Sequence, residues 1–253
     1  MRKLSVRPGS FGPYANEAYD RLPEMGIQYV EIAVPSRETI STVKAELSAA
    51  GLTALSLQGN FDVKSPTALT DFEPDLEMIA AMESPYLFLS VKHEETPEGL
   101  AYERLHALGE VLKPIGVTAV LETHPDMISN GDIALKTMQG VNHPNVLVNF
   151  DTANIYFYNE GINGVDEMRK VIDYIGAIHL KDTDGGFKNW HFPALGEGIV
   201  DFLDVYQTLD EHGYDGPYTM ELEGIEGESL SREEHIARVQ NSVSHMEKLG
   251  FMT

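Results

Sequence analysis

Eight short apolar runs, each followed by a segment with helical periodicity, recur along the 253-residue chain. The runs are rich in β-branched and aromatic residues, which predicts buried parallel strands joined by helices. Because no linker or low-complexity tract separates the eight units, we expect the sheet to close into a barrel. The predicted strands are Leu4–Val6, Tyr29–Val34, Leu52–Gln58, Tyr86–Val91, Val117–Leu121, Val146–Phe150, Ala177–Leu180 and Tyr218–Leu222.

The spacing of these units predicts one domain over residues 1–253, a single (β/α)₈ TIM barrel with parallel strands. The length is close to the roughly 250 residues typical of such barrels. An open doubly wound sheet is the alternative, but no GxGxxG motif follows the first predicted strand. The expected helical segments are Glu17–Met25, Glu38–Ala50, Asp71–Met82, Pro97–Leu112, Gly131–Met138 and Val165–Tyr174, with an amphipathic helix after each of the last two strands.

The charge balance restricts the partners of this chain. Its 40 acidic and 18 basic residues give a formal net charge of −22, which repels nucleic acid and anionic membranes. No stretch approaches the roughly 20 apolar residues of a membrane span. The chain has no cysteine, so any metal must be bound by oxygen and imidazole. We therefore expect a cytoplasmic protein with neither nucleic-acid nor membrane partners, and leave a homo-oligomer open.

Four metal-competent side chains stand at the ends of consecutive predicted strands: Glu122 in LETH, Asp151 in NFDTAN, His179 in IHLKD and Glu221 in MELEG. Singly, each carboxylate can be a helix cap and the histidine a structural one. In a closed barrel, however, the strand ends meet at one mouth, where three carboxylates would repel one another. A divalent cation relieves that repulsion, and this oxygen-rich set suits Mn²⁺, Mg²⁺ or Co²⁺ better than a closed structural zinc site.

These motifs, together with HLKDTDG, LGEGIVDF and the GYDG turn, resemble the xylose isomerase-like barrel superfamily in its sugar (phosphate) isomerase/epimerase branch. The resemblance implies that Glu122, Asp151, His179 and Glu221 bind one divalent metal. It also implies that Glu122 and Glu221 are the catalytic acid/base pair of a keto-sugar epimerase. We expect Mn²⁺, with Mg²⁺, Co²⁺ or Zn²⁺ as alternatives.

Five further residues are candidates for substrate binding. Asn154 stands where many relatives have a histidine, and can hydrogen-bond a hydroxyl but cannot act as a general base. His124 is expected to contact substrate or to orient the neighbouring glutamate. Lys181 is expected either to contact an anionic oxygen or to form a structural ion pair. Trp190 and His191 suggest a sugar-stacking surface with a polar contact, with a simple loop anchor as the alternative.

Other titratable residues carry simpler expectations. Glu31, on the second predicted strand, is expected to point into the barrel, where it needs a partner. Five histidines on predicted helices or turns are expected at the surface: His106, His143, His212, His235 and His245.

The expected reaction is proton abstraction next to the carbonyl of a neutral keto-sugar or related polyol, through a metal-bound enediolate. A small-molecule carbohydrate is therefore the expected partner, since Glu223, Glu226 and Glu228 in the last strand-to-helix loop disfavour a phosphate. The first alternative is a metal-dependent lyase or dehydratase acting on a keto-sugar or inosose. An endonuclease IV-like DNA-repair enzyme is disfavoured by the charge and by histidines that this sequence lacks. A non-catalytic carbohydrate-binding barrel is disfavoured by the intact four-residue set.

Overall fold

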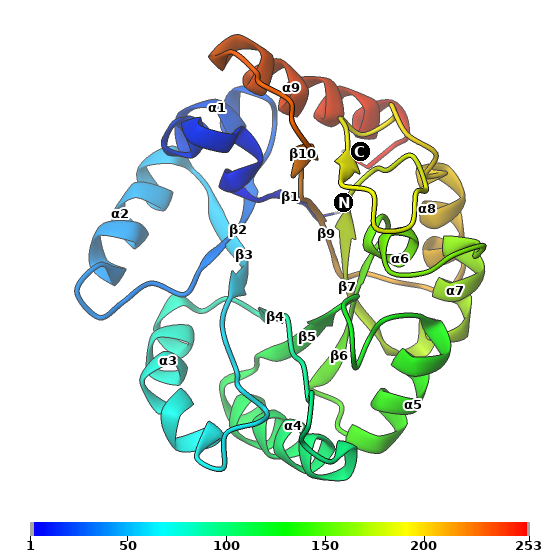
Figure 1. Ribbon diagram of the computed structural model, residues 1–253. Helices are drawn as coiled ribbons and strands as arrows, with labels where there is room; N and C mark the ends of the chain where they lie inside the picture. The colour runs from blue at the N-terminus through cyan, green and yellow to red at the C-terminus, as the bar shows by residue number, and fades with distance from the viewer. Residues whose placement is uncertain (1–2, 252–253) are drawn as a thin grey trace.

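The computed structural model describes residues 3–251, and its centre is a closed barrel of eight parallel strands with helices around the outside (Figure 1). The strands follow one another around the barrel in chain order, so the predicted fold is confirmed. They are β1 (Lys3–Val6), β2 (Tyr29–Ala33), β3 (Thr53–Gln58), β4 (Tyr86–Leu89), β5 (Thr118–Glu122), β6 (Val146–Asp151), β7 (Ile175–Leu180) and β9 (Pro217–Met220).

The helices agree with the predicted segments, with shifted ends. The segment expected from Glu17 begins as an irregular 3₁₀ stretch, and the one expected from Val165 ends in a 3₁₀ turn. No helix among residues 3–251 is both long and apolar enough to cross a membrane. The elements are η1 (Pro8–Glu17), α1 (Ala18–Glu24), α2 (Ile40–Ala50), α3 (Ala68–Met82), α4 (Glu98–Leu112), η2 (Lys113–Ile115), α5 (Gly131–Val141), α6 (Asn154–Phe157), α7 (Gly164–Lys170), η3 (Ile172–Tyr174), α8 (Phe202–Glu211) and α9 (Arg232–Lys248).

Local sequence explains several helix ends. Ser231 and Glu234 form a capping box at the start of α9, in which each side chain accepts a hydrogen bond from the other residue's backbone N–H. The Asn130 side chain caps α5 in the same position. Gly51 ends α2 with a φ of 68°, a left-handed conformation that suits glycine. Helix α9 then packs against η1, so the last helix contacts the segment that directly follows β1.

The core has two parts because side chains on a strand alternate between the two faces of the sheet. Leu87 and Leu121 belong to the large cluster between the barrel and its helices. Phe88, which follows Leu87, and Val120, which precedes Leu121, point to the other face and form a smaller cluster with Ala177. Each large side chain removed from water contributes about 1.5–3 kcal/mol. The smaller cluster underlies the polar end of the barrel, because Phe88 stacks on His179 at a centroid distance of 4.7 Å.

A second, two-stranded sheet lies outside the barrel and was not predicted. It pairs β8 (His191–Phe192) antiparallel with β10 (Gly224–Ile225). In Figure 1 these strands join the long loop after β7 to the loop after β9. The backbone N–H of Glu226 also donates to the Trp190 carbonyl at 2.8 Å. The loop that carries Trp190 is therefore held over the mouth by main-chain hydrogen bonds.

Asp182 organises the rest of that long loop. Its buried carboxylate accepts backbone hydrogen bonds from Gly196 at 2.8 Å, Gly198 at 2.9 Å and Val200 at 3.1 Å. Hydrogen bonds to a charged group contribute about 1.5–3 kcal/mol each. The LGEG motif therefore folds around a carboxylate that lies three residues beyond His179.

Candidate metal centre and substrate cleft

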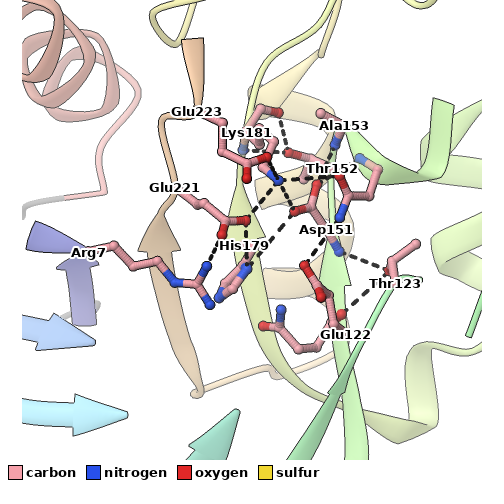
Figure 2. Close-up of polar contacts among 12 residues, drawn as sticks. Arg7, Glu122, Thr123, Asp151, Thr152, Ala153, His179, Lys181, Glu221 and Glu223 are labelled. Atoms are coloured by element: carbon pink, nitrogen blue, oxygen red, sulfur yellow. Dashed lines mark hydrogen bonds and ion pairs between the residues drawn. The ribbon is translucent and has the colours of Figure 1, made fainter. Parts of the chain in front are cut away.

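The four strand-end residues come together at the mouth of the barrel. Glu122 and Asp151 are the last residues of β5 and β6, His179 lies one residue before the end of β7, and Glu221 directly follows β9. One ligand atom from each lies within 4.8 Å of the others. Figure 2 shows their side chains turned toward a common centre. Sheet register contributes directly, because Asp151 is the strand partner of His179.

Asp151 and His179 each have one polar atom held by a hydrogen bond and one that faces the centre of the cluster. Asp151 Oδ1 accepts the backbone N–H groups of Ala153 and Asn154, each at 2.8 Å. His179 Nε2 lies 3.1 Å from Glu31 Oε1, so the N–H on this nitrogen donates to the carboxylate. Nδ1 is then the lone-pair nitrogen. Asp151 Oδ2 and His179 Nδ1 are buried and make no hydrogen bond within the described chain.

The two glutamates follow the same pattern. Glu221 Oε1 pairs with Arg7 Nη1, whereas Oε2 is buried without a hydrogen bond and lies 3.2 Å from His179 Nδ1. Glu122 Oε1 accepts from the Asn154 side-chain amide at 3.2 Å. Of these three buried atoms, Asp151 Oδ2 and Glu221 Oε2 lie within ion-pair distance of the Lys181 ammonium, and His179 Nδ1 has no donor among the described residues. Three acceptor atoms facing one another, in a set of one imidazole and three carboxylates, fit a divalent cation.

Arg7 and Glu31 support the cluster from β1 and β2. Glu31 is buried and accepts from Arg7 Nε at 2.5 Å. Burial alone would raise the pKa of the Glu31 carboxyl, but the Arg7 guanidinium and His179 outweigh it and hold that pKa far below its usual range. The guanidinium also lies 4.4 Å above the Phe88 ring. In metal sites, a carboxylate that hydrogen-bonds the second ring nitrogen of a histidine fixes the tautomer and orientation of that ring. Glu31 holds this position beside His179, and His179 and Arg7 are the partners that Glu31 was expected to need.

Sequence reasoning missed Arg7. It follows a short strand and precedes a proline, so it reads as a turn residue. Figure 2 shows it reaching from β1 toward Glu221. The available signal was its position directly after the first predicted strand, because the end of any barrel strand points to the mouth.

Lys181 is buried among carboxylates. Its Nζ lies 2.8 Å from Glu221 Oε2, 3.1 Å from Asp151 Oδ2 and 2.7 Å from Glu223 Oε2. Burial alone would lower the pKa of this ammonium, but Asp151, Glu223 and Glu122 raise it above its usual value. The ammonium also lies 5.1 Å from the centre of the Phe192 ring. The structure therefore contains the ion pairs that the sequence left as one of two alternatives for Lys181.

A cavity of about 270 Å³ opens above the cluster, and four of the five candidate substrate-binding residues line it: His124, Asn154, Lys181 and Trp190. The fifth, His191, belongs to β8, where its backbone pairs with β10. It lines neither this cavity nor its neighbour among the described residues. Contact with substrate remains a prediction for all five.

Aromatic rings form one wall of this cavity. Trp190 packs edge-on against Phe192 at 5.1 Å and Phe157 at 5.9 Å, with 41% of its surface exposed. His124 makes an edge contact with Tyr158 at 4.8 Å. Burial, then the charges of nearby carboxylates, raise the pKa of Tyr158 to about 12. A partly exposed ring face beside polar groups is a common surface for carbohydrate binding.

One expectation about the remaining histidines was wrong. His143 was placed at the surface, but it is buried. Its Nε2 lies 2.9 Å from Glu110 Oε1, and its Nδ1 accepts the backbone N–H of Asn145 at 3.0 Å. An added Cβ on Gly109 would collide with the His143 ring, so the side chain enters the α4–α5 interface where a neighbouring helix has only a glycine.

About a third of the chain is similar in sequence to a protein of known activity. L-ribulose-5-phosphate 3-epimerase UlaE of Escherichia coli (strain ATCC 8739) is 39% identical over 88 residues, which are 34% of this chain and 29% of that protein. The match thus spans less than a third of the relative's length.

Two solved structures share the fold over almost the whole chain. D-allulose 3-epimerase of Methylomonas sp. has a TM-score of 0.78 at 17% identity and covers 98% of each chain. The probable 3-DHS dehydratase AsbF of Bacillus anthracis has a TM-score of 0.77 at 16% identity, covering 98% of this chain and 99% of that one. At these identities the likeness concerns the fold. The model of one family matches residues 19–248, so the chain belongs to the xylose isomerase-like TIM barrel family.

Proposed function

We propose that the protein is a divalent-metal-dependent epimerase or isomerase of a neutral keto-sugar or related polyol. The observation that carries this proposal is the strand-end cluster, in which one acceptor atom from each of an imidazole and three carboxylates lies within 4.8 Å of the others. Among the proteins similar to this chain, UlaE and the Methylomonas enzyme are sugar 3-epimerases, which supports the same reaction class.

The proposed ligands are Glu122, Asp151, His179 and Glu221. Mn²⁺ is the expected ion, with Mg²⁺, Co²⁺ or Zn²⁺ as alternatives, because the set is rich in oxygen and has one borderline nitrogen. When bound, the ion supplies Lewis acidity that polarises the substrate carbonyl. The charge balance also favours a bound cation, because the carboxylates that face one another at this site outnumber the two cationic side chains, Arg7 and Lys181.

The side chains of the site divide the remaining tasks. Glu122 and Glu221 stand at the two ends of the cluster, so one can remove the proton beside the carbonyl and the other can return it from the opposite side, which epimerises that carbon. Lys181 and Asn154 offer an ammonium and an amide to substrate oxygens. The aromatic wall around Trp190 limits the access of water to the reacting carbon.

Charge favours a neutral substrate. Glu223 lines the small cavity, and Glu228 lines the cavity beside it. The two cations nearest to them are already paired, Lys181 with Glu223 and Arg238 with Glu228. A phosphate would have to displace a carboxylate from one of these pairs. We therefore expect the unphosphorylated form of a keto-sugar to have the higher kcat/KM, and a preference of about tenfold for the ester, worth ~1.4 kcal/mol, would contradict this.

Solvent exchange tests the reaction class. After reconstitution with Mn²⁺, a panel of ketoses and aldoses in D₂O should give an epimer or isomer with deuterium at the reacting carbon, observed by NMR and mass spectrometry. Turnover without exchange would indicate a hydride shift and refute proton transfer. An unsaturated product would assign the protein to the dehydratase alternative, and cleavage of abasic duplex DNA to the nuclease alternative.

A further inference from the structure

A second, larger cavity adjoins the one above the strand-end cluster. Its volume is about 570 Å³, against about 270 Å³ for the smaller cavity. Ligand pockets typically measure about 300–1,000 Å³, so the smaller cavity alone lies just below that range. Five residues line both cavities, which makes them one continuous cleft: Arg7, Gln58, Trp190, Glu221 and Glu223.

The larger cavity has a mixed apolar and polar wall. Tyr19, Ile32 and Leu222 contribute apolar surface. Gly12 lies in its wall with a φ of 59°, which suits glycine, and an added Cβ there would come within 2.6 Å of the His235 ring, which also lines the cavity. Such a wall suits a ligand that has both hydroxyl groups and apolar ring faces.

The cations of the larger cavity are already neutralised. Arg7 is paired with Glu31 and Glu221, and Arg238 with Glu228 at 2.5 Å. No lysine lines this cavity among the described residues. An anionic group entering it would lose hydration without gaining a free counter-charge, which is costly. An uncharged group has no such cost, so the cavity favours a neutral occupant over an anion.

Arg7 marks the junction of the two cavities and has an unused donor. Its Nε and Nη1 contact carboxylates, whereas Nη2 is buried and makes no hydrogen bond within the described chain. A buried donor without a partner costs about 1–3 kcal/mol. A substrate oxygen that passes from one cavity to the other would satisfy this N–H. The side chain therefore suits the linking oxygen, or an adjacent hydroxyl, of a molecule that spans both cavities.

We propose that the larger cavity is a subsite for a second, uncharged, hydroxyl-bearing ring, so that the substrate is a keto-sugar that carries a glycosyl group on a hydroxyl other than the anomeric one, which leaves its carbonyl free, rather than a single ring. This rests on the proposed function, because the reacting ring occupies the small cavity above the cluster. The second ring stacks beside Trp190, which lines both cavities.

The test compares a ketohexose with a glycoside of it in which glucose is attached through a hydroxyl other than the anomeric one, so that the carbonyl stays free. Both are assayed with the wild-type protein and with two variants in which an alanine is replaced by phenylalanine. Ala33→Phe fills the larger cavity only, since the exposed Ala33 lines it and does not line the small one. Ala81→Phe is the matched control, an exposed alanine of α3 that lines neither cavity. Solvent deuterium exchange gives kcat/KM. Calorimetric titration with the two corresponding alcohols, in which the carbonyl is reduced, gives binding without turnover.

We expect the glycoside to exceed the ketohexose in kcat/KM by roughly tenfold or more, the factor that corresponds to ~1.4 kcal/mol. Ala33→Phe should remove most of this preference, and Ala81→Phe should change it by no more than roughly twofold, as for other surface substitutions. If the ketohexose reacts and the glycoside shows no advantage, the second subsite is refuted while the proposed function stands.

If neither sugar exchanges deuterium, the proposed function fails, and calorimetry then decides on the cavity. Tighter binding of the reduced glycoside than of the reduced ketohexose, lost in Ala33→Phe and kept in Ala81→Phe, supports a two-ring ligand. Equal binding of the two alcohols, or equal effects of the two variants, overturns it.

Discussion

The two glutamates at the ends of the strand-end cluster differ in what holds them. Glu122, at the end of β5, is partly exposed and accepts a hydrogen bond from the neutral amide of Asn154. Glu221, directly after β9, is buried and contacts two cations, Arg7 and Lys181. The same chemical group is therefore fixed by charge on one side of the mouth and held by a single neutral donor on the other.

This difference separates two roles that the sequence could not distinguish. A carboxylate engaged by two cations is a well-fixed ligand, but its oxygens are less available to a substrate C–H. A carboxylate at the edge of the cavity, with a neutral partner, is freer to approach the reacting carbon. We therefore expect Glu122 to remove the proton, and Glu221 to act mainly as a ligand and to return the proton.

The largest expected effect is on turnover. Glu122→Gln should lower kcat by about 10²–10⁴-fold, the range for loss of a general base. Because Glu122 is also a proposed ligand, kcat is measured at Mn²⁺ concentrations that saturate the variant, with bound metal determined by elemental analysis. If Glu122→Gln keeps kcat within roughly tenfold of wild type while Glu221→Gln loses the full factor, the two roles are reversed.

The same pair of variants should differ in metal-free stability. Glu221→Gln removes a negative charge from Arg7 and Lys181, and should lower the free energy of unfolding by about 1.5–3 kcal/mol, the range for hydrogen bonds to charged groups. Glu122→Gln removes a carboxylate that faces other carboxylates, so stability should not fall. Urea unfolding in the presence of EDTA measures both. Equal losses in the two variants would show that their surroundings are energetically equivalent.

The third expected effect is on the affinity for Mn²⁺, through Glu31, which orients the His179 ring. Glu31→Gln should weaken Mn²⁺ binding by about 10–100-fold, as for other groups that hydrogen-bond a ligand histidine. An amide in place of the carboxylate no longer balances Arg7, and it can donate to His179 Nε2 and so favour the wrong tautomer. Calorimetric titration with Mn²⁺ measures the change. Glu46→Gln, at an exposed position on α2, is the control and should bind Mn²⁺ like the wild type.

The parts of the fold that depend on periodicity could be predicted from sequence. Every predicted strand exists, because short branched runs between helices specify both the strand and its place in the barrel. The cluster of Glu122, Asp151, His179 and Glu221 was also predictable, since equivalent strand ends must meet once the barrel closes.

The parts that depend on contacts between distant loops could not be predicted. Each strand of the β8–β10 sheet is only two residues long, and neither has a hydrophobic pattern of its own. The contacts of Arg7 with Glu31 and Glu221 join three strands and depend on side-chain reach rather than on spacing. His143 appeared solvent-exposed by its position after a helix, and its burial depends on Gly109 of the neighbouring helix.

The smallest expected effect is a change in the pKa of Tyr158, which depends on the nearby charge of Glu122. Its folded-state pKa of about 12 comes first from burial and then from Glu122, Asp151 and Glu223. The unfolded value is about 10, so the protonated phenol stabilises the fold fully below pH 10, and this contribution is lost as the pH rises from 10 to 12. In metal-free protein with ¹³Cζ-labelled tyrosine, Glu122→Gln should lower this pKa.

Glu221→Gln should leave the Tyr158 titration unchanged, because Arg7 and Lys181 already balance the charge of Glu221. Tyr158→Phe assigns the resonance, and it should also flatten the loss of stability between pH 10 and 12. A decrease in the Tyr158 pKa of equal size in both glutamate variants would mean that the negative field is uniform across the mouth. In that case the cations would not distinguish the two glutamates, and the assignment of Glu122 as the base would lose its electrostatic support.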